Sequence, residues 1–292
     1  MSSLAQLLQH GQSCWMDDLT RRMIESGSLA RRVGEEGLRG ITSNPSIFAE
    51  AIERGDDYAR DIADAAVRHE TPQQIYEDLT VSDIQNACDV LRPVYEGTQG
   101  ADGFASLEVS PHLAHDTQGS IEEARRLWRR VDRPNLFIKI PGTAAGVPAI
   151  EQLLFDGINI NVTLLFSVAR FEAVAEAYMR ALERRLAAKR PIEGVASVAS
   201  FFLSRIDVLV DGLLEQRIVP GRPPEPDPQA LVGKAGIANA KLAYRKFHQN
   251  LASPRWKALA QKGARVQRVL WASTSTKNPR YPDLMYVEPL IG

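Results

Sequence analysis

The stretch Leu136-Phe137-Ile138-Lys139-Ile140-Pro141-Gly142-Thr143 is an apolar run that contains one lysine and ends at a proline–glycine pair. Polar and apolar residues do not alternate along it, which favours a strand buried on both faces, as in a parallel sheet. Six other short apolar runs occur along the chain, and most of them share this character. We therefore predict seven strands. One is Leu136–Ile140, and the others are Ser13–Met16, Leu38–Thr42, Phe104–Val109, Ile158–Thr163, Val195–Phe201 and Val266–Ala272.

Longer stretches with helix start signals separate these predicted strands. A small polar residue before proline, or with Glu or Gln three positions later, is typical of a helix start. The predicted starts are Asn44 before Pro45, Thr71 before Pro72 with Gln74, Ser120 with Glu123 as a capping box, and Ser167. We also predict that a long helix fills much of Gln229–Leu251, after a loop at Gly221–Pro228.

The alternation of strands and helices allows two architectures, a (β/α)8 barrel or a doubly wound sheet. The dinucleotide fingerprint G-x-G-x-x-G is absent after the first predicted strand, and the chain has no Walker A motif. We therefore predict an α/β fold, a (β/α)8 TIM barrel, with residues 1–292 forming a single catalytic domain. In such a barrel the functional residues lie at the carboxyl ends of the strands.

Composition excludes several functional classes. Lys and Arg number 35, and Asp and Glu number 36, giving a formal charge of -1 that argues against a nucleic-acid or membrane-surface protein. Cys14 and Cys88 are too few for a disulfide framework. The start of the sequence lacks the pattern of a signal peptide, and no apolar run approaches the roughly 20 residues that span a bilayer. We expect a cytoplasmic protein.

Lys139 is unusual because lysine is rarely buried in an apolar strand without a partner. One interpretation is a snorkelling or edge lysine. The other is a lysine inside the barrel whose neutral amine attacks a carbonyl group. The ordinary lysine pKa is about 10.4, so only roughly 0.1% is neutral at pH 7. Burial in an apolar interior would lower that pKa and supply the nucleophile.

Acidic residues lie at the ends of two other predicted strands. Glu108 is set between Leu107 and Val109, and it is either a salt-bridge partner for a neighbouring strand or a general acid/base. Asp17 and Asp18 follow the first predicted strand. We expect one of them to cap a helix and the other to point into the barrel mouth.

Amides, hydroxyls and cations follow the later strands. Asn161 and Thr163 share one face of their strand because side chains alternate with a period of two, and taken alone they could simply be strand-end polar groups or helix caps. Hydroxyl groups beside a cation suit a phosphate, with a solvated loop as the alternative. Such groups are Ser200 with Arg205, and Ser275 with Lys277.

Six segments at these strand ends occur together and in one order through nearly the whole chain. They are Trp15–Leu19 (WMDDL), Gly40–Ser46 (GITSNPS), Leu107–Val109 (LEV), Phe137–Pro141 (FIKIP), Asn159–Ser167 (NINVTLLFS) and Ser200–Asp207. In these segments the chain resembles the transaldolase family, in its longer bacterial form, within the class I Schiff-base aldolase superfamily. The resemblance implies a (β/α)8 barrel in the pentose phosphate pathway that moves a dihydroxyacetone unit from a ketose phosphate to an aldose phosphate, without a metal or an organic cofactor.

The resemblance also implies a role for each strand-end residue. Lys139 matches the Schiff-base lysine, Glu108 and Thr163 match the pair that holds a catalytic water, and Asp17 matches the acid of the C–C bond step. Asn44 and Asn161 match substrate-binding positions. The phosphate site is matched by Ser200, Arg205, Ser275 and Lys277. Lys277 stands where many members have arginine, which keeps the charge but loses the bidentate fork.

Two alternatives to a transaldolase stay open at this point. One is a sugar-phosphate aldolase, a lyase that uses the same lysine. The other is an inactive barrel that only binds sugar phosphates or a partner.

The end of the sequence raises a further expectation, because a barrel of this type needs eight strands and the pattern predicts seven. We expect the sequence to stop before the eighth strand, as a fragment of a longer protein. Leu284–Ile291 could instead act as a makeshift eighth strand, or a second copy could fill the gap. The expected assembly is therefore a monomer or a homodimer.

Overall fold

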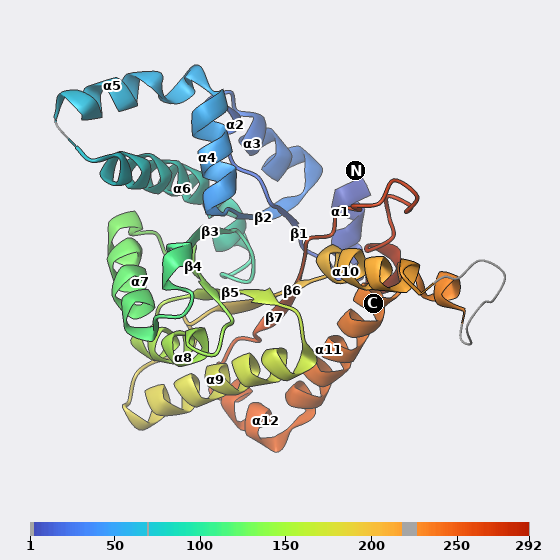
Figure 1. The fold of residues 1–292 in the computed structure, drawn as a ribbon. Helices are drawn as coiled ribbons and strands as arrows, with labels where there is room; N and C mark the ends of the chain where they lie inside the picture. Colours follow the sequence, from blue (N-terminus) through green and yellow to red (C-terminus); the bar gives the residue numbers. More distant parts are fainter. Residues whose placement is uncertain (1–2, 69, 218–226, 292) are drawn as a thin grey trace. The chain divides into compact units, whose positions relative to one another are not determined.

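The computed structural model describes residues 3–68, 70–217 and 227–291, which form two compact units, residues 1–140 and 141–292. Figure 1 traces the elements in chain order. The first unit contains α1 (Ser3–Leu7), η1 (Leu8–His10), β1 (Cys14–Met16), α2 (Arg21–Glu25), α3 (Ser28–Arg31), η2 (Arg32–Glu36), β2 (Leu38–Thr42), α4 (Pro45–Arg54), η3 (Asp56–Tyr58), α5 (Ala59–Val67), α6 (Pro72–Gly97), β3 (Phe104–Glu108), η4 (Pro111–Leu113), α7 (Thr117–Val131) and β4 (Leu136–Pro141), whose last residue crosses the boundary. The second contains α8 (Gly146–Asp156), β5 (Ile160–Leu165), α9 (Val168–Ala187), β6 (Ser197–Phe202), α10 (Ser204–Glu215), η5 (Pro228–Leu231), α11 (Ala235–Ala252), α12 (Pro254–Ala260), β7 (Arg268–Ala272) and η6 (Glu288–Leu290).

The strands of each unit pair in parallel with their neighbours in the sequence. In the first unit β1 pairs with β2, β2 with β3 and β3 with β4. In the second unit β5 pairs with β6, and β6 with β7. Helical segments separate all of these strands. This strand–helix repeat is that of a (β/α) barrel, and the described residues follow it through seven strands. The predicted fold class and the seven predicted strands are confirmed.

Aromatic rings fill the core of the first unit. Phe137 stacks on Phe104 with ring centres 4.2 Å apart, and Trp15 stacks on Phe137 at 6.1 Å. Gly40 makes room for this stack, because a Cβ atom there would lie 2.4 Å from the Trp15 ring. The strands that carry Lys139 and Glu108 are thus held by close packing of large side chains.

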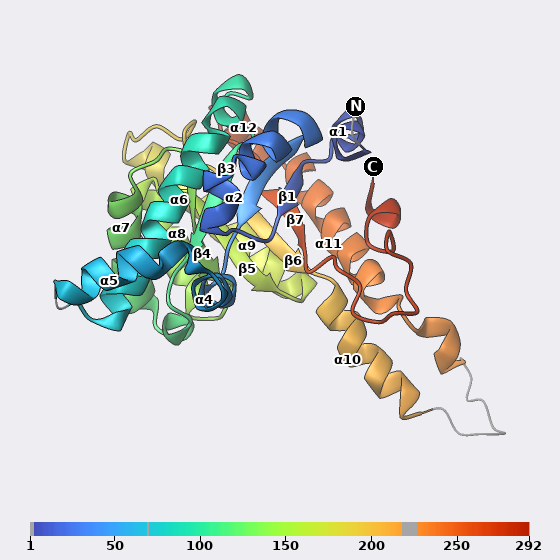
Figure 2. The same cartoon turned by 90° about the horizontal axis from the view of Figure 1, so that it is seen from above.

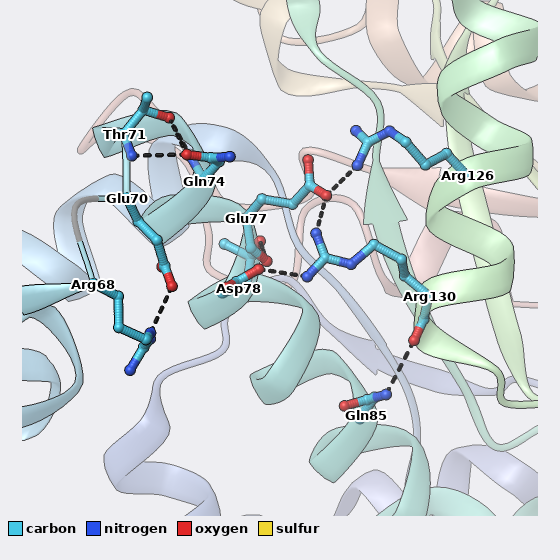
Figure 3. A network of polar contacts seen from close by, with 10 residues as sticks. Arg68, Glu70, Thr71, Gln74, Glu77, Asp78, Gln85, Arg126 and Arg130 are labelled. Atoms are coloured by element: carbon cyan, nitrogen blue, oxygen red, sulfur yellow. Dashed lines mark hydrogen bonds and ion pairs between the residues drawn. The ribbon is translucent and has the colours of Figure 1, made fainter. Parts of the chain in front are cut away.

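Helix α6 packs against β2, β3 and α7, and a charged network joins it to α7 (Figure 3). Glu77 accepts hydrogen bonds from Arg126 and Arg130, and Asp78 accepts another from Arg130. The Gln85 amide donates to the Arg130 carbonyl at 3.2 Å. Much of this network is exposed, so we expect it to orient the two helices more than to stabilise them.

Three of the four predicted helix starts are confirmed. The side chains of Asn44, Thr71 and Ser167 accept hydrogen bonds at the first turns of α4, α6 and α9, and Gln74 completes the capping box of α6. In the second unit α9 then packs beside α8 and α11.

The predicted start at Ser120 is wrong. Helix α7 begins at Thr117, and the Asp116 side chain accepts a hydrogen bond from the Gly119 N–H. The Ser120 hydroxyl donates to the Leu113 carbonyl at 3.0 Å, and Glu123 accepts from the Ser110 N–H at 3.1 Å. Both side chains fasten the segment before the helix, and Ser120 itself already lies inside α7.

The long helix predicted to fill much of Gln229–Leu251 is confirmed as α11, with the short η5 before it. η5 and α11 are separated at Gly233, whose φ of 71° is left-handed and interrupts a right-handed helix. The loop predicted at Gly221–Pro228 lies, except for its last two residues, outside the described part of the chain.

Leu284–Ile291 does not form a strand. The segment contains turns and η6, and its Tyr286 is buried. No strand follows β7 in residues 273–291, so the makeshift eighth strand considered above is not observed.

Candidate active site

Lys139 and Glu108 form the centre of the candidate site in the first unit. The parallel register of β3 and β4 places Glu108 opposite Lys139. The Lys139 Nζ lies 3.0 Å from the Glu108 Oε2 and donates to the Ser43 carbonyl at 3.0 Å. The two side chains are only 8% and 13% exposed. The structure therefore pairs a nearly buried amine with a nearly buried carboxylate.

The surroundings of Glu108 shift its pKa upward. Burial raises the pKa of Glu108 above its usual value, the positive charge of Lys139 opposes this rise, and the negative charge of Asp17 adds to it. Burial, with a contribution from the charge of Glu108, raises the pKa of Tyr76 on α6 to about 12. Tyr76 is thus an electrostatic neighbour of Glu108 that the sequence pattern did not single out.

Asp17 and Asn44 lie at the ends of β1 and β2. Asp17 is exposed, and its Oδ1 accepts a hydrogen bond from the Thr42 hydroxyl at 2.6 Å. Asn44 Oδ1 accepts from the Ile47 N–H at 3.0 Å and caps α4. The predicted helix cap at Asp17 or Asp18 is wrong, because Thr20 caps α2.

The second unit holds a buried amide and hydroxyl pair. Asn161 Oδ1 accepts a hydrogen bond from the Ser200 hydroxyl at 2.7 Å, and both residues are almost completely buried. Thr163 is 1% exposed, and its carbonyl accepts from the Gly142 N–H at 2.8 Å. The polar face predicted for Asn161 and Thr163 therefore lies in the interior of the described fold.

A backbone irregularity follows Thr163. Leu164 has a φ of 60°, a left-handed conformation that is costly for a residue with a side chain. The β5–β6 register shifts between Val162 and Leu165, as in a β-bulge. As a result Leu164 and Phe166 are exposed, whereas Leu165 is buried. Sequence reasoning missed this feature because no glycine marks the turn.

The predicted phosphate groups lie on α10 and on the segment after β7. Arg205 is exposed in the first turn of α10, with its guanidinium 5.2 Å from the centre of the Phe202 ring. Lys277 and Ser275 are also exposed, and the Lys277 Nζ donates to the Ser275 hydroxyl at 2.6 Å. The structure thus pairs Ser275 with Lys277 and Ser200 with Asn161, and no hydrogen bond joins Arg205 to Ser275 within the described ranges.

Two kinds of feature are absent from the described residues. These residues contain no group of three or more His, Cys, Asp or Glu side chains arranged to hold a metal ion. None of their helices is long and apolar enough to cross a membrane.

Comparison with known proteins identifies the class. Residues 14–292 match the profile of the family described as Transaldolase/Fructose-6-phosphate aldolase. The chain belongs to this family. It is 51% identical over 296 residues to Transaldolase 2 of Nostoc sp. (strain PCC 7120), covering 100% of this chain and 77% of that protein. It is 50% identical to a transaldolase of Trichodesmium erythraeum (97% and 75% covered) and 49% identical to one of Parafrankia sp. (99% and 77%).

These relatives confirm the predicted family and support the predicted transferase activity. Identity near one half extends over nearly the whole chain, and each of these relatives is named as a transaldolase. The family description also includes an aldolase. Sugar phosphates are the substrates that this family implies.

Proposed function

We propose that this protein transfers a dihydroxyacetone unit from a ketose phosphate, sedoheptulose 7-phosphate or fructose 6-phosphate, to an aldose phosphate in the non-oxidative pentose phosphate pathway. The observation that carries the proposal is the nearly buried Lys139, with its Nζ 3.0 Å from Glu108. A lysine must give up a proton before it attacks a carbonyl group, and a carboxylate at hydrogen-bond distance is a base that can take it.

The first step is Schiff-base formation on Lys139. The Nζ passes a proton to Glu108, attacks the ketone carbon, and the resulting carbinolamine loses its hydroxyl as water. Glu108 returns the proton to that leaving hydroxyl, through a water that Thr163 orients in this proposal. General acid/base groups of this kind typically contribute about 10²–10⁴-fold.

The second step is cleavage of the C–C bond. Asp17 takes the proton of the hydroxyl on the second carbon beyond the iminium carbon, the bond between that carbon and the first one breaks, and the far fragment leaves as an aldose phosphate. The electron pair stays on the three-carbon unit bound to Lys139 as an enamine. Attack of this enamine on the acceptor aldehyde forms the new C–C bond, and Asp17 returns its proton to the oxygen of that aldehyde. Water then releases the product from Lys139.

Binding residues complete the proposal. Asn44 and Asn161 hydrogen-bond the substrate, and Ser200, Arg205, Ser275 and Lys277 hold its phosphate. Support for Arg205 and Lys277 is their exposure together with their positive charge. We propose no metal or organic cofactor, because Lys139 supplies the electron sink when it forms the iminium ion.

We also propose three broader properties. Residues 1–292 act as one catalytic domain, the protein works as a monomer or homodimer, and it is located in the cytoplasm. Cys14 and Cys88 are both free, as is usual for a protein in a reducing compartment.

Reductive trapping tests the central step. Borohydride added with fructose 6-phosphate should fix a three-carbon adduct on Lys139, identified by peptide mass spectrometry. Lys139→Arg should show no adduct and no turnover, because guanidinium stays protonated at physiological pH. An adduct on another lysine, with Lys139 unmodified, would overturn the assignment.

The lyase alternative needs a separate measurement. A transaldolase should consume fructose 6-phosphate rapidly only when an aldose phosphate acceptor is present. Equal rates with and without the acceptor would favour the aldolase.

A further inference from the structure

Helix α10 buries polar residues and exposes apolar ones, the reverse of an ordinary surface helix. Asp207 is completely buried and Asp211 is 5% exposed. By contrast, Val208, Leu209 and Leu213 are each more than half exposed. Buried carboxylates are costly unless they are fully hydrogen-bonded, so their partners indicate what this helix does.

The two aspartates make matching sets of hydrogen bonds. Asp207 accepts from the Gly236 N–H at 2.8 Å and from the Tyr286 hydroxyl at 2.7 Å. Four residues later, Asp211 accepts from the Gly233 N–H at 2.9 Å and from the Tyr281 hydroxyl. Each carboxylate therefore joins one glycine amide, just before α11 or in its first turn, to one tyrosine in the segment after β7.

The two glycines fit this arrangement closely. A Cβ atom at Gly236 would lie 2.6 Å from the Asp207 Oδ2, and one at Gly233 would lie 3.2 Å from the Tyr281 ring. Gly233 also has a left-handed φ of 71°. The backbone at these two positions can thus approach the carboxylates so closely only because glycine has no side chain.

Two more contacts extend the pattern to both ends of α10. The Ser204 hydroxyl lies 2.8 Å from that of Ser273, and Arg280 donates to Glu215 at 3.0 Å. Positions 204, 207, 211 and 215 are three or four residues apart, so they share one face of the helix. Residues 273–286, which we call the strap, are therefore fastened along that face, and Figure 2 shows the chain after β7 running beside α10.

We propose that the strap is a positioning device for the substrate phosphate. Ser275 and Lys277 lie between the anchors Ser273 and Arg280, and Arg205 lies in the first turn of the helix to which the strap is fastened. The residues that fasten the strap are then positioning residues, because they hold Lys277 of the strap in a fixed place relative to Arg205 of α10. They are Asp207, Asp211, Tyr281 and Tyr286. The inference rests on the proposed phosphate site. Its physical basis is that a tethered loop loses less conformational entropy when it binds a ligand.

The test removes single hydroxyl groups from the strap. In Tyr281→Phe and Tyr286→Phe, the amides of residues 274–281 should exchange with deuterium faster than in the unchanged protein. The KM for fructose 6-phosphate should rise roughly tenfold, as for loss of one charge-assisted hydrogen bond. The KM for unphosphorylated dihydroxyacetone, trapped on Lys139, should change less than twofold.

Tyr178→Phe is the matched control. Its buried hydroxyl donates to the carbonyls of Val195 and Arg265, away from the strap. This variant should leave both KM values and the exchange of residues 274–281 unchanged. If the tyrosine variants of the strap fail to fold, Glu215→Gln removes the ion pair with Arg280 at an exposed position and should show the same effects more weakly.

The phosphate site itself is tested by Arg205→Ala and Lys277→Ala. If these raise the KM for fructose 6-phosphate but the strap variants speed exchange without changing it, the strap is only structural and the inference is overturned. If neither Arg205→Ala nor Lys277→Ala affects the phosphorylated substrate selectively, the proposed phosphate site fails, and the positioning role fails with it. The exchange data would still report whether the strap is fastened.

Discussion

At the residue scale, Glu108 determines how the lysine can react. Its carboxylate is the negative group at 3.0 Å from the Lys139 Nζ, and burial raises its pKa while Lys139 opposes that rise. A raised pKa means that Glu108 keeps its proton to a higher pH than an exposed glutamate. Because the proposed base form is the ionised one, kcat/KM should increase as pH rises through this raised pKa.

The first prediction follows from the upward direction of this pKa shift. The acid limb of the kcat/KM profile should lie above the ordinary glutamate pKa of about 4.3. Glu108→Gln should abolish this limb and lower kcat/KM by roughly 10²–10⁴-fold, or about 2.7–5.5 kcal/mol. Glu122→Gln, an exposed change on α7, should leave the profile unchanged. A loss below about tenfold for Glu108→Gln would reduce this residue to a structural role.

Leu164 carries the second prediction. Its left-handed φ of 60° costs about 1–2 kcal/mol for a residue with a Cβ atom, and glycine avoids that cost. Leu164→Gly should therefore leave the free energy of unfolding unchanged or slightly higher in urea denaturation. Leu165→Gly is the control, because removing its buried side chain should lower the free energy of unfolding by more than about 2 kcal/mol. Equal losses in both variants would argue against strain at Leu164.

At the scale of elements, helix α7 shows that contacts with the preceding segment help to determine where a helix begins. Ser120 and Glu123 have the spacing of a capping box, yet they bind Leu113 and Ser110 in the segment before the helix. The cap is Asp116, whose side chain accepts a hydrogen bond from the Gly119 N–H at 2.9 Å.

The third prediction concerns this cap. Asp116→Ala should lower the free energy of unfolding by about 0.5–2 kcal/mol, because an N–H of the first turn loses its acceptor. Asp116→Asn keeps an acceptor oxygen and should cost much less. Thermal or urea denaturation of the two variants measures the difference. If both changes were neutral, the cap would contribute nothing measurable to α7.

At the scale of the whole molecule, residues 1–140 and 141–292 are compact units, whereas the proposed mechanism needs them to act as one domain. The fourth prediction is therefore a single cooperative transition in differential scanning calorimetry, with equal calorimetric and van't Hoff enthalpies. Asp116→Ala, in the first unit, should shift the whole transition to lower temperature. Two separate transitions, only one of them shifted, would contradict the single-domain proposal.

Much of the fold could be predicted from the sequence because its signals are local. Apolar runs of a few residues predicted all seven strands of the described residues. Asn44, Thr71 and Ser167 predicted their helix starts through caps that reach only three residues ahead. The strand-end motifs also predicted the family, now shown by the match over residues 14–292. The pairing of Lys139 with Glu108 agrees with the parallel register that these strands imply.

Contacts between distant segments were decided only by the tertiary structure. The Tyr286–Asp207 hydrogen bond joins residues 79 apart, and the bond from Lys139 to the Ser43 carbonyl joins residues 96 apart. The left-handed backbone of Leu164 likewise depends on the register shift against β6 and carries no glycine signal. Caps and strand periodicity are set by a few adjacent residues, whereas partners across the fold depend on how whole elements pack, and single-sequence patterns contain no term for that packing.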